Sequence, residues 1–456
     1  MEFLDRVDEK ERLRKALDRK GTSLIVLYGR RRIGKSELIK RVLNDDDIFF
    51  MADKTDQAQQ RHLFAMSLSS KFPNFDRINF ATWEDLLSEL CYRAQHVQRF
   101  TVCLDEFPYL VKSCPELPSV IQKFIDMKRF PFHLILCGSS QHTMQDIVLN
   151  SSEPLYGRAQ QVIKLKPLHV HFMREAFNES ADKLVDEYAV WGGVPRYWEL
   201  REEEGNMMDT IISEIANTEG MLYDEPDRLL ADDLQQTAMA SSILSIIGSG
   251  ANRLSEIATR LDRKSTDLSV PIKKLIDLGY IEREIPFGEN AKNTKRSLYK
   301  ISDEFLNFYH RFIVPERSLI GLDRKDVVRK YIEDNYADYA GKEWKKLCRH
   351  AVSGNTLFGI TWNVASRWWG TVARDKQIEL DVVAESIDRK SILIGECKWT
   401  KQENAEKLLE NLISRAKEFP YLNKHQVYYA LFLRHEPVDG MKDYVVLPED
   451  VIDDLS

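Results

Sequence analysis

SLIVLYGRRRIGKS, residues 23–36, joins a short apolar run to a glycine-rich loop and the first residue of a helical pattern. The run 23–28 has the length and composition of a buried strand, and SELIKRVL, residues 36–43, has helical spacing. Residues 29–36 fit the pattern GxxxxGK[ST] between a strand and a helix, which is the context of a phosphate-binding loop. The stretch therefore predicts a P-loop, and a chance match is the weaker alternative.

The chemistry of such a loop assigns its residues to ATP and Mg²⁺. Gly29 and Gly34 let backbone N–H groups close around phosphate oxygens, at the positive end of the following helix. Lys35 is expected to contact the β- and γ-phosphates, and the Ser36 hydroxyl to ligate Mg²⁺. The other predicted nucleotide-binding residues in and after the loop are Arg30, Arg31, Arg32, Ile33 and Glu37.

Other predicted strands end in polar residues of the kind that ATP hydrolysis needs. FTVCLDE, residues 100–106, ends in Asp105, expected to hold Mg²⁺ through water, and Glu106, expected to polarise the attacking water. HLILCGSS ends near Ser139, which would lie on the γ-phosphate side unless it only terminates the strand. Arg158 and Arg196 are candidates for a positive charge on ATP, from the same chain or a neighbouring copy. Structural ion pairing is the alternative for both arginines.

The chain divides by pattern into five parts, of which the first is an α/β ATPase core at 1–170. Apolar runs at 23–28, 48–51, 100–104, 133–137 and 161–165 alternate with helical stretches, which predicts a parallel sheet. Helical spacing around a Gly-Gly-Val-Pro turn predicts a helical lid at 171–238.

Helices followed by strands at 281–286 and 297–301 predict a winged helix-turn-helix at 239–301, although Pro271 stands inside the second helix. Aromatic-rich helical spacing at 302–340 predicts a connector. The rest, 341–456, is expected to form a separate α/β domain with strands at 377–384, 391–397 and 426–433 and a helix at 401–418.

The expected winged helix is locally basic. Residues 251–300 carry eleven Lys and Arg against seven Asp and Glu, whereas the whole chain has a net charge of −7. Such a local excess favours contact with nucleic-acid phosphates, so DNA is an expected partner. The basic residues are Lys292, Lys295 and Arg296 in the wing and Arg263, Lys264, Lys273 and Lys274 around the recognition helix. Docking of a protein partner is the alternative.

Two predicted strands of the C-terminal domain carry charged residues in alternation. In IELDVV, residues 378–383, Glu379 and Asp381 would share one face of the strand, and Ile378, Leu380 and Val382 would point to the other. In IGECK, residues 394–398, Glu396 and Lys398 would likewise share one face. Carboxylates with a lysine on adjacent strands suit Mg²⁺-dependent phosphodiester cleavage. The alternation by itself favours the other interpretation, an ordinary solvent-exposed face of a sheet.

GRRRIGKS, LDEFPYL, LILCGSS, PLYGRA and GGVPRYW, in this order, resemble the prokaryotic ATPases of the archaeal-type AAA family. LSEIATRL, LIDLGYIERE, YKISDEFLNFYHRF, ASRWWG, IELDVVA and GECKW are similar to that family's winged helix and C-terminal domain of unknown function. The resemblance implies an ATPase core of the AAA-like or related signalling type, a lid, a winged helix and a restriction-endonuclease-like PD-(D/E)xK domain. It makes Asp381 and Glu396 the expected metal ligands and Lys398 the expected catalytic lysine.

The sequence departs from this family at one position. Members usually carry Glu after the aromatic residue of a Gly-x-x-aromatic-Glu helix, whereas Gly341-Lys342-Glu343-Trp344-Lys345 places Lys345 there. Glu343 lies two residues earlier and cannot share the same helical face. The resemblance therefore implies a nuclease-like fold that lacks one acidic ligand.

Composition narrows the function classes. With 43% hydrophobic and 30% charged residues the chain is typical of folded proteins, and its 456 residues suggest about three domains. The charged N-terminus is unlike a signal peptide, and the six scattered cysteines predict a reducing compartment and no zinc site. No apolar run approaches the ~20 residues that span a bilayer, so we expect a cytoplasmic protein without a membrane partner. The leading hypothesis is an ATP-hydrolysing regulator that repositions the winged helix and C-terminal domain on DNA. The alternatives are an ATP-regulated nuclease, and a slow ATP-bound switch or scaffold that docks a protein partner or a second copy.

Overall fold

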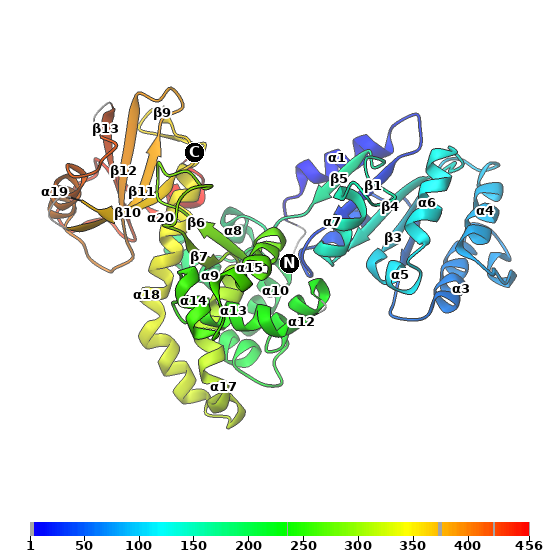
Figure 1. Cartoon of the computed structure of the whole chain (residues 1–456), viewed down its shortest axis with the longest axis horizontal. Coiled ribbons are helices and arrows are strands. Elements are labelled where there is room, and N and C mark those ends of the chain that lie inside the picture. The colour runs from blue at the N-terminus through cyan, green and yellow to red at the C-terminus, as the bar shows by residue number, and fades with distance from the viewer. Residues whose placement is uncertain (1–3, 235, 373–375, 423–424, 456) are drawn as a thin grey trace.

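The computed structural model describes residues 4–234, 236–372, 376–422 and 425–455. Figure 1 shows two sheet-containing parts at opposite ends of the molecule and a largely helical part between them. The N-terminal sheet lies in the blue and cyan part of the chain, and the second large sheet in the orange part. Among the described residues, no helix combines the length and the apolar character needed to cross a membrane.

The N-terminal sheet has five parallel strands in the order β2-β3-β4-β1-β5. Its strands are β1 (Leu24–Tyr28), β2 (Ile48–Met51), β3 (Thr101–Asp105), β4 (His133–Gly138) and β5 (Gln161–Lys164). They differ from the predicted ranges by no more than one residue at either end. The predicted parallel sheet of a P-loop ATPase core is therefore confirmed.

Both faces of this sheet are covered, which explains why its central strands are apolar throughout. Ile25 and Leu27 of β1 belong to one hydrophobic cluster, whereas Leu24 and Val26 belong to another on the opposite face. The helices of this part are α1 (Val7–Leu17), α2 (Lys35–Lys40), α3 (Gln57–Leu68), α4 (Trp83–Ala94), α5 (Phe107–Ser113), α6 (Leu117–Asp126) and α7 (Gln141–Leu149).

The strand order decides where the functional residues meet. Because β4 pairs with both β1 and β3, the carboxyl ends of these three strands lie side by side at one edge. The P-loop follows β1, Glu106 follows β3 and Ser139 follows β4. Ligands of open parallel sheets bind at this edge.

Helices continue through the middle of the chain. They are α8 (Met173–Ala176), α9 (Ala181–Trp191), α10 (Pro195–Glu204), α11 (Met207–Thr210) with a π-helical turn at Ile211–Ile215, and α12 (Glu225–Asp233). Gly193 lets the turn before α10 pack against the core, because a Cβ at this residue would lie 1.9 Å from the carbonyl oxygen of Leu168.

Three helices and a two-stranded antiparallel hairpin follow. They are α13 (Ala238–Gly248), α14 (Leu254–Arg260), α15 (Ser269–Leu278), β6 (Ile281–Glu284) and β7 (Leu298–Ile301). Pro271 is the third residue of α15 rather than an interior one, and the first turn of a helix tolerates proline because its N–H groups have no partner within the helix. This order of elements is the one expected of a winged helix, and that assignment stays a prediction.

The helical part ends in a long helix that enters the C-terminal domain. After α16 (Glu304–Phe308), a π-helical turn at Tyr309–Ile313 and α17 (Val314–Gly321), helix α18 runs from Lys325 to Val352. It passes without a break through the predicted boundary at residue 340. The Tyr339 hydroxyl donates to the carbonyl of Ala189 in α9 (2.7 Å), so α18 is anchored on the helical part before it reaches the second sheet.

The C-terminal sheet is mixed, in the order β10-β11-β12-β13-β14. Its strands are β10 (Ser366–Thr371), β11 (Gln377–Glu385), β12 (Ser391–Lys398), β13 (Gln426–Leu433) and β14 (Val445–Val446), preceded by the short pair β8 (Thr356–Leu357) and β9 (Ile360–Thr361). Helix α18 packs on one face and α19 (Ala405–Ala416) on the other, and α20 (Pro448–Ile452) ends the domain. The predicted C-terminal α/β arrangement is present, while its nuclease-like identity stays a prediction.

Candidate nucleotide site and C-terminal carboxylates

The P-loop has a backbone that only particular residues can adopt. Gly29 (φ +158°) and Gly34 (φ +89°) flank it, and a Cβ on Gly29 would lie 2.5 Å from the carbonyl oxygen of Leu165. The buried Arg6 guanidinium donates to the carbonyls of Ile33 (3.3 Å) and Lys166 (2.8 Å), which ties the loop to the segment after β5. Arg6 was not among the predicted residues, because a lone arginine before a helix carries no sequence signal.

The predicted Mg²⁺ and hydrolysis residues converge at the carboxyl edge of the sheet. The Ser36 hydroxyl donates to the Asp105 carboxylate (2.6 Å), and the Ser139 hydroxyl donates to the Glu106 carboxylate (2.9 Å). Glu106 has a left-handed backbone (φ +52°), a strained conformation that turns its side chain toward β4. Lys35 is buried and donates to the carbonyls of Gly29 (3.0 Å) and Arg30 (2.9 Å).

This donor set fits Mg²⁺. One hydroxyl and one buried carboxylate oxygen already lie in contact, and hard oxygen ligands of this kind are what Mg²⁺ binds beside substrate phosphates. Within the described residues, no lysine or arginine forms a salt bridge with Asp105 or Glu106. Both carboxylates are therefore available to a cation and to a water molecule.

The three P-loop arginines point away from the sheet toward the helical part. Arg32 pairs with the fully buried Glu225 of α12 (3.4 Å), and Arg31 pairs with Asp232 of the same helix (3.2 Å). Arg30 forms an ion pair with Asp303, which precedes α16, and donates to the hydroxyl of Tyr197 in α10 (2.9 Å). The Tyr197 hydroxyl in turn donates to Glu225 (3.1 Å), so Arg30 and Arg32 share one buried polar network with the lid, while Arg31 contacts α12 separately.

A second connection starts from the turn after β4. The buried Asp233 carboxylate, at the end of α12, accepts the Gln141 N–H at the start of α7 (2.7 Å) and lies 2.8 Å from the Tyr280 hydroxyl. Gln141 also donates to the carbonyl of Leu278 at the end of α15 (3.2 Å). Burial raises the pKa of Asp233, while these hydrogen bonds oppose the rise. The turn that carries Ser139 therefore touches both the lid and the segment from α15 to β7, which we call the β6–β7 region.

Three further side chains predicted to bind the nucleotide form ion pairs with other residues. Arg158 pairs with Asp126 through two contacts (2.8 and 2.9 Å) near the amino end of β5, opposite the P-loop edge, so the prediction that it acts on its own chain's nucleotide is wrong. Its action on a neighbouring copy stays a prediction. The Arg196 side chain pairs with Glu199 (2.8 Å), and Glu37 is exposed and pairs with Arg41 (3.1 Å).

The C-terminal carboxylates lie where two strands separate. Strand β11 pairs with β12 only as far as Val382↔Gly395, after which β11 continues along β10 and β12 along β13. An extra residue in β11 between Leu380 and Val383 makes a bulge, because these two residues pair with Trp368 and Ser366 of β10. The predicted strict alternation is therefore wrong at Val382, which packs under α18 while Leu380 packs under α19.

The carboxylates in this fork are buried and already paired. Asp381 accepts from the Lys345 ammonium (2.7 Å) and the Cys397 N–H (3.1 Å). Glu396 pairs with Lys398 (3.0 Å) and with Arg415 of α19 (2.7 Å). Asp381 and Glu396 have less than a tenth of their surface exposed, so the interpretation as an ordinary solvent-exposed face is wrong for these two residues. The Glu379 and Lys398 side chains are partly exposed.

Lys345 decides what the fork can hold. Its ammonium contacts the Asp381 Oδ1 atom (2.7 Å), while Glu343 accepts from Asn307 (2.7 Å). With both Asp381 oxygens and both Glu396 oxygens facing N–H donors, the predicted Mg²⁺ site at Asp381, Glu396 and Lys398 does not fit a metal ion in this arrangement.

Comparison with known proteins places both ends of the chain. Residues 3–200 match the family described as an ATPase domain predominantly from Archaea, and residues 309–408 match one described as Archaea bacterial proteins of unknown function. An uncharacterized protein of Methanocaldococcus jannaschii is 30% identical over 440 residues, 94% of this chain and 95% of that protein.

Two solved structures of archaeal proteins match this chain, and the first shows a similar fold. The Walker-type ATPase of Pyrococcus abyssi has a TM-score of 0.53 at 20% identity, and the match covers 68% of this chain and 96% of that one. The ORC2 protein of Aeropyrum pernix, solved as ADPNP–ADP complexes, has a TM-score of 0.46 at 15% identity and covers 71% of this chain and 96% of its own.

Proposed function

The chain belongs to the archaeal family that joins an N-terminal ATPase domain to a C-terminal domain of unknown function, and from this premise we propose that it hydrolyses Mg-ATP and couples its nucleotide state to DNA binding. The coupling and the DNA are the new parts of the proposal. The observation that carries the coupling is the pairing of all three P-loop arginines with residues of the helical part.

The residues at the sheet edge divide the chemistry among them. Gly29 and Gly34 allow the loop to wrap the phosphates, and Lys35, which now donates to two loop carbonyls, turns to the β- and γ-phosphates when ATP enters. Ser36 and Asp105 would hold Mg²⁺, Asp105 through water, and the bound ion would neutralise phosphate charge. Glu106, held in place by Ser139, accepts hydrogen bonds from the attacking water and orients it.

Nucleotide binding changes the same loop that holds the helical part. Phosphate entry redirects Lys35 away from the carbonyls of Gly29 and Arg30, and Arg30 carries the ion pair to Asp303 and the hydrogen bond to Tyr197. Hydrolysis changes the surroundings of Glu106 and Ser139, two residues before Gln141, which bonds to Asp233 and Leu278. The second path ends at Leu278 of α15, inside residues 239–301, which we propose to be the DNA-binding winged helix. The first ends at Asp303, two residues after β7.

In this function the C-terminal domain contacts DNA and does not cleave it. The fork between β11 and β12, with an aspartate at a bulge and Glu396 and Lys398 on the next strand, supports the nuclease-like fold implied by the sequence resemblance. The Lys345–Asp381 pair argues against metal-dependent cleavage there.

The test is the ATP turnover rate of the full chain with and without DNA in the presence of Mg²⁺. We expect turnover that DNA alters, and loss of turnover in Lys35→Ala but not in the matched control Lys40→Ala, an exposed lysine five residues on. Full turnover in Lys35→Ala would refute the assigned site. Turnover that neither duplex nor single-stranded DNA changes would refute the coupling, and DNA cut during the assay would refute the non-cleaving role of the fork.

A further inference from the structure

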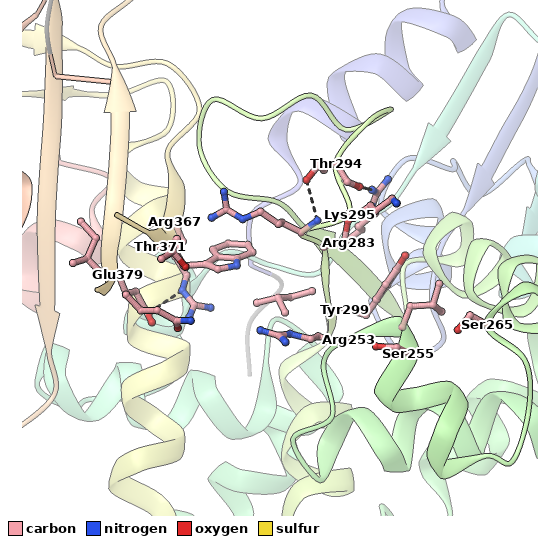
Figure 2. A pocket seen from close by; sticks show the side chains of 18 residues that line it. Arg253, Ser255, Ser265, Arg283, Thr294, Lys295, Tyr299, Arg367, Thr371 and Glu379 are labelled. Atoms are coloured by element: carbon pink, nitrogen blue, oxygen red, sulfur yellow. Dashed lines mark hydrogen bonds and ion pairs between the residues drawn. The ribbon is translucent and has the colours of Figure 1, made fainter. Parts of the chain in front are cut away.

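A cleft of about 950 Å³ lies between the β6–β7 region and the C-terminal sheet. One wall comes from the start of α14 and from the hairpin, and the other from β10 and β11 (Figure 2). Figure 2 shows Arg253 and Arg283 on the first wall and Arg367 and Glu379 on the second. Neither the ATP site nor the fork residues Asp381 and Glu396 line it.

The cleft is strongly basic. Five basic residues line it against one acidic residue, Glu379; the basic residues are Arg253, Arg283, Lys295, Arg296 and Arg367. Arg253 and Lys295 are exposed, and no carboxylate within the described residues pairs with either of them. Such unpaired cations facing a cavity are suited to a polyanion.

A third cation, the Arg283 guanidinium, is held in position by hydrogen bonds to uncharged groups. Arg283 donates to the Ser297 hydroxyl (2.8 Å) and to the carbonyls of Ala291 (2.9 Å) and Thr294 (3.2 Å). These bonds fix its position along the hairpin without neutralising its charge. The hairpin therefore presents a charge in a set place, as a site for phosphate requires.

Aromatic side chains interrupt the basic lining. Tyr299 of β7 and Trp369 of β10 are half-buried and come from opposite walls. The Arg367 guanidinium lies 5.1 Å from the centre of the Trp369 ring, and in the sheet Trp369 pairs with Glu379. Aromatic rings between cations are what unpaired bases stack on in proteins that bind single strands.

The two walls are joined through the loop between β6 and β7, which limits what can enter. The Phe287 N–H donates to the carbonyl of Arg367 (2.9 Å). The Arg296 guanidinium lies against β10, where a Cβ on Gly370 would be 2.7 Å from its Nη2 atom. A volume of about 950 Å³ is at the upper end of the ~300–1,000 Å³ of small-ligand sites, so the cleft suits a few nucleotides and excludes the body of a duplex.

We propose that this cleft binds a short unpaired segment of nucleic acid, with its phosphates on Arg253, Arg283 and Lys295 and a base stacked on Trp369. The inference rests on the DNA binding in the proposed function and names the form of the nucleic acid and the residues that hold it. Stacking requires a free base face, which a paired and stacked duplex does not offer. A strand in this cleft contacts the winged-helix region and the C-terminal domain at once.

The test measures binding of a fluorescent oligothymidylate to the full chain by anisotropy, against a blunt duplex and an oligouridylate. We expect the single strand to bind more tightly than the duplex. Trp369→Ala is expected to weaken single-strand binding about 5- to 150-fold, the range for removal of one stacked base. Tyr92→Ala, which removes an exposed aromatic residue of the ATPase core, is the matched control and is expected to bind as the wild type.

A second variant keeps the test independent of the fold of β10. Arg253→Ala combined with Lys295→Ala removes two exposed cations and is expected to lower the slope of log affinity against log salt by about 1.4, because each phosphate neutralised on a single strand contributes about 0.7 to that slope. Lys390→Ala, at an exposed turn between β11 and β12, is the control for charge. Equal affinity for the two oligonucleotides would show that the 2′-hydroxyl plays no part in recognition. Weaker binding of oligouridylate would show a preference for DNA. Either result supports the site.

The outcomes separate this inference from the proposed function. Wild-type affinity in both cleft variants, tighter binding of duplex than of single strand, or displacement by polyglutamate as readily as by oligothymidylate would overturn the cleft as a nucleic-acid site. If DNA still alters ATP turnover in that case, the proposed coupling stands without the cleft. If the cleft variants lose strand binding while DNA leaves ATP turnover unchanged, the cleft stands and the coupling falls.

Discussion

The hydrogen bond between Tyr280 and Asp233 gives the sharpest test of coupling between the ATP site and the β6–β7 region. The Tyr280 hydroxyl lies 2.8 Å from the Asp233 carboxylate and 2.9 Å from the carbonyl of Leu229, and the Tyr280 side chain is buried. Tyr280→Phe keeps the ring and removes only the hydroxyl. It touches none of Lys35, Asp105, Glu106 and Ser139, so basal ATP turnover is expected to persist.

The magnitude follows from the kind of bond that is removed. A hydrogen bond to a charged acceptor contributes about 1.5–3 kcal/mol, and the carboxylate left behind keeps its bonds from the N–H groups of Gln141 and His142. Allosteric coupling energies are typically about 1–3 kcal/mol, a factor of about 5 to 150. If this bond forms in only one nucleotide state, its removal takes away a coupling free energy in that range. The effect of DNA on ATP turnover should then fall at least about fivefold.

The assay is the ratio of ATP turnover with saturating DNA to turnover without DNA. Tyr280→Phe and Asp233→Asn should both reduce this ratio, and Tyr92→Phe, at an exposed position, should not. A wild-type ratio in both variants would show that this contact does not transmit nucleotide state. A loss of basal turnover equal to the loss of stimulation would show that the contact supports the ATP site itself.

Three further results are expected. Lys345→Met should leave Asp381 without its ammonium partner and create Mn²⁺ binding detectable by calorimetry; equal binding by the wild type would refute the block by Lys345. Gly193→Ala places a Cβ 1.9 Å from the backbone oxygen of Leu168 and should lower the free energy of unfolding by about 3 kcal/mol in urea titrations, whereas Gly21→Ala, in open space, should not. Burial lowers the pKa of His310 to about 4, so between about pH 6.5 and pH 4 the unfolded chain binds a proton at this residue and the folded chain does not. The free energy of unfolding should therefore fall over this range by about 3 kcal/mol more in the wild type than in His310→Gln, as measured by urea unfolding.

Local patterns were sufficient for the core sheet and for the residues at its carboxyl edge. The strands around Ile25, Cys103 and Ile135 are buried on both faces, and continuous apolar runs of this length have few other stable arrangements. Ser36, Asp105, Glu106 and Ser139 meet because carboxyl ends of parallel strands share one edge. Arg158 lies outside this rule, because it precedes its strand and so lies at the opposite edge.

The bulge in β11 shows where periodicity stops being informative. A period of two predicts that Leu380 and Val382 share a face, yet one extra residue sends them to opposite cores. The bulge depends on which strands β11 pairs with, and pairing partners far apart in the chain are not encoded in local alternation. The same is true of Lys345, whose meeting with Asp381 required α18 to lie against the fork.

The sequence by itself determined the ATP-binding edge, because a P-loop, a strand that ends in two acids and the apolar runs between them are each local, and the parallel sheet brings them together. Only the tertiary structure decided the partners of Arg30, Arg31 and Arg32, the neutralised fork and the basic cleft. Each of these joins side chains from segments distant in sequence, and their contacts depend on how the helical part packs between the two sheets. The sequence shows which side chains are charged, but the tertiary packing determines which opposite charges they meet.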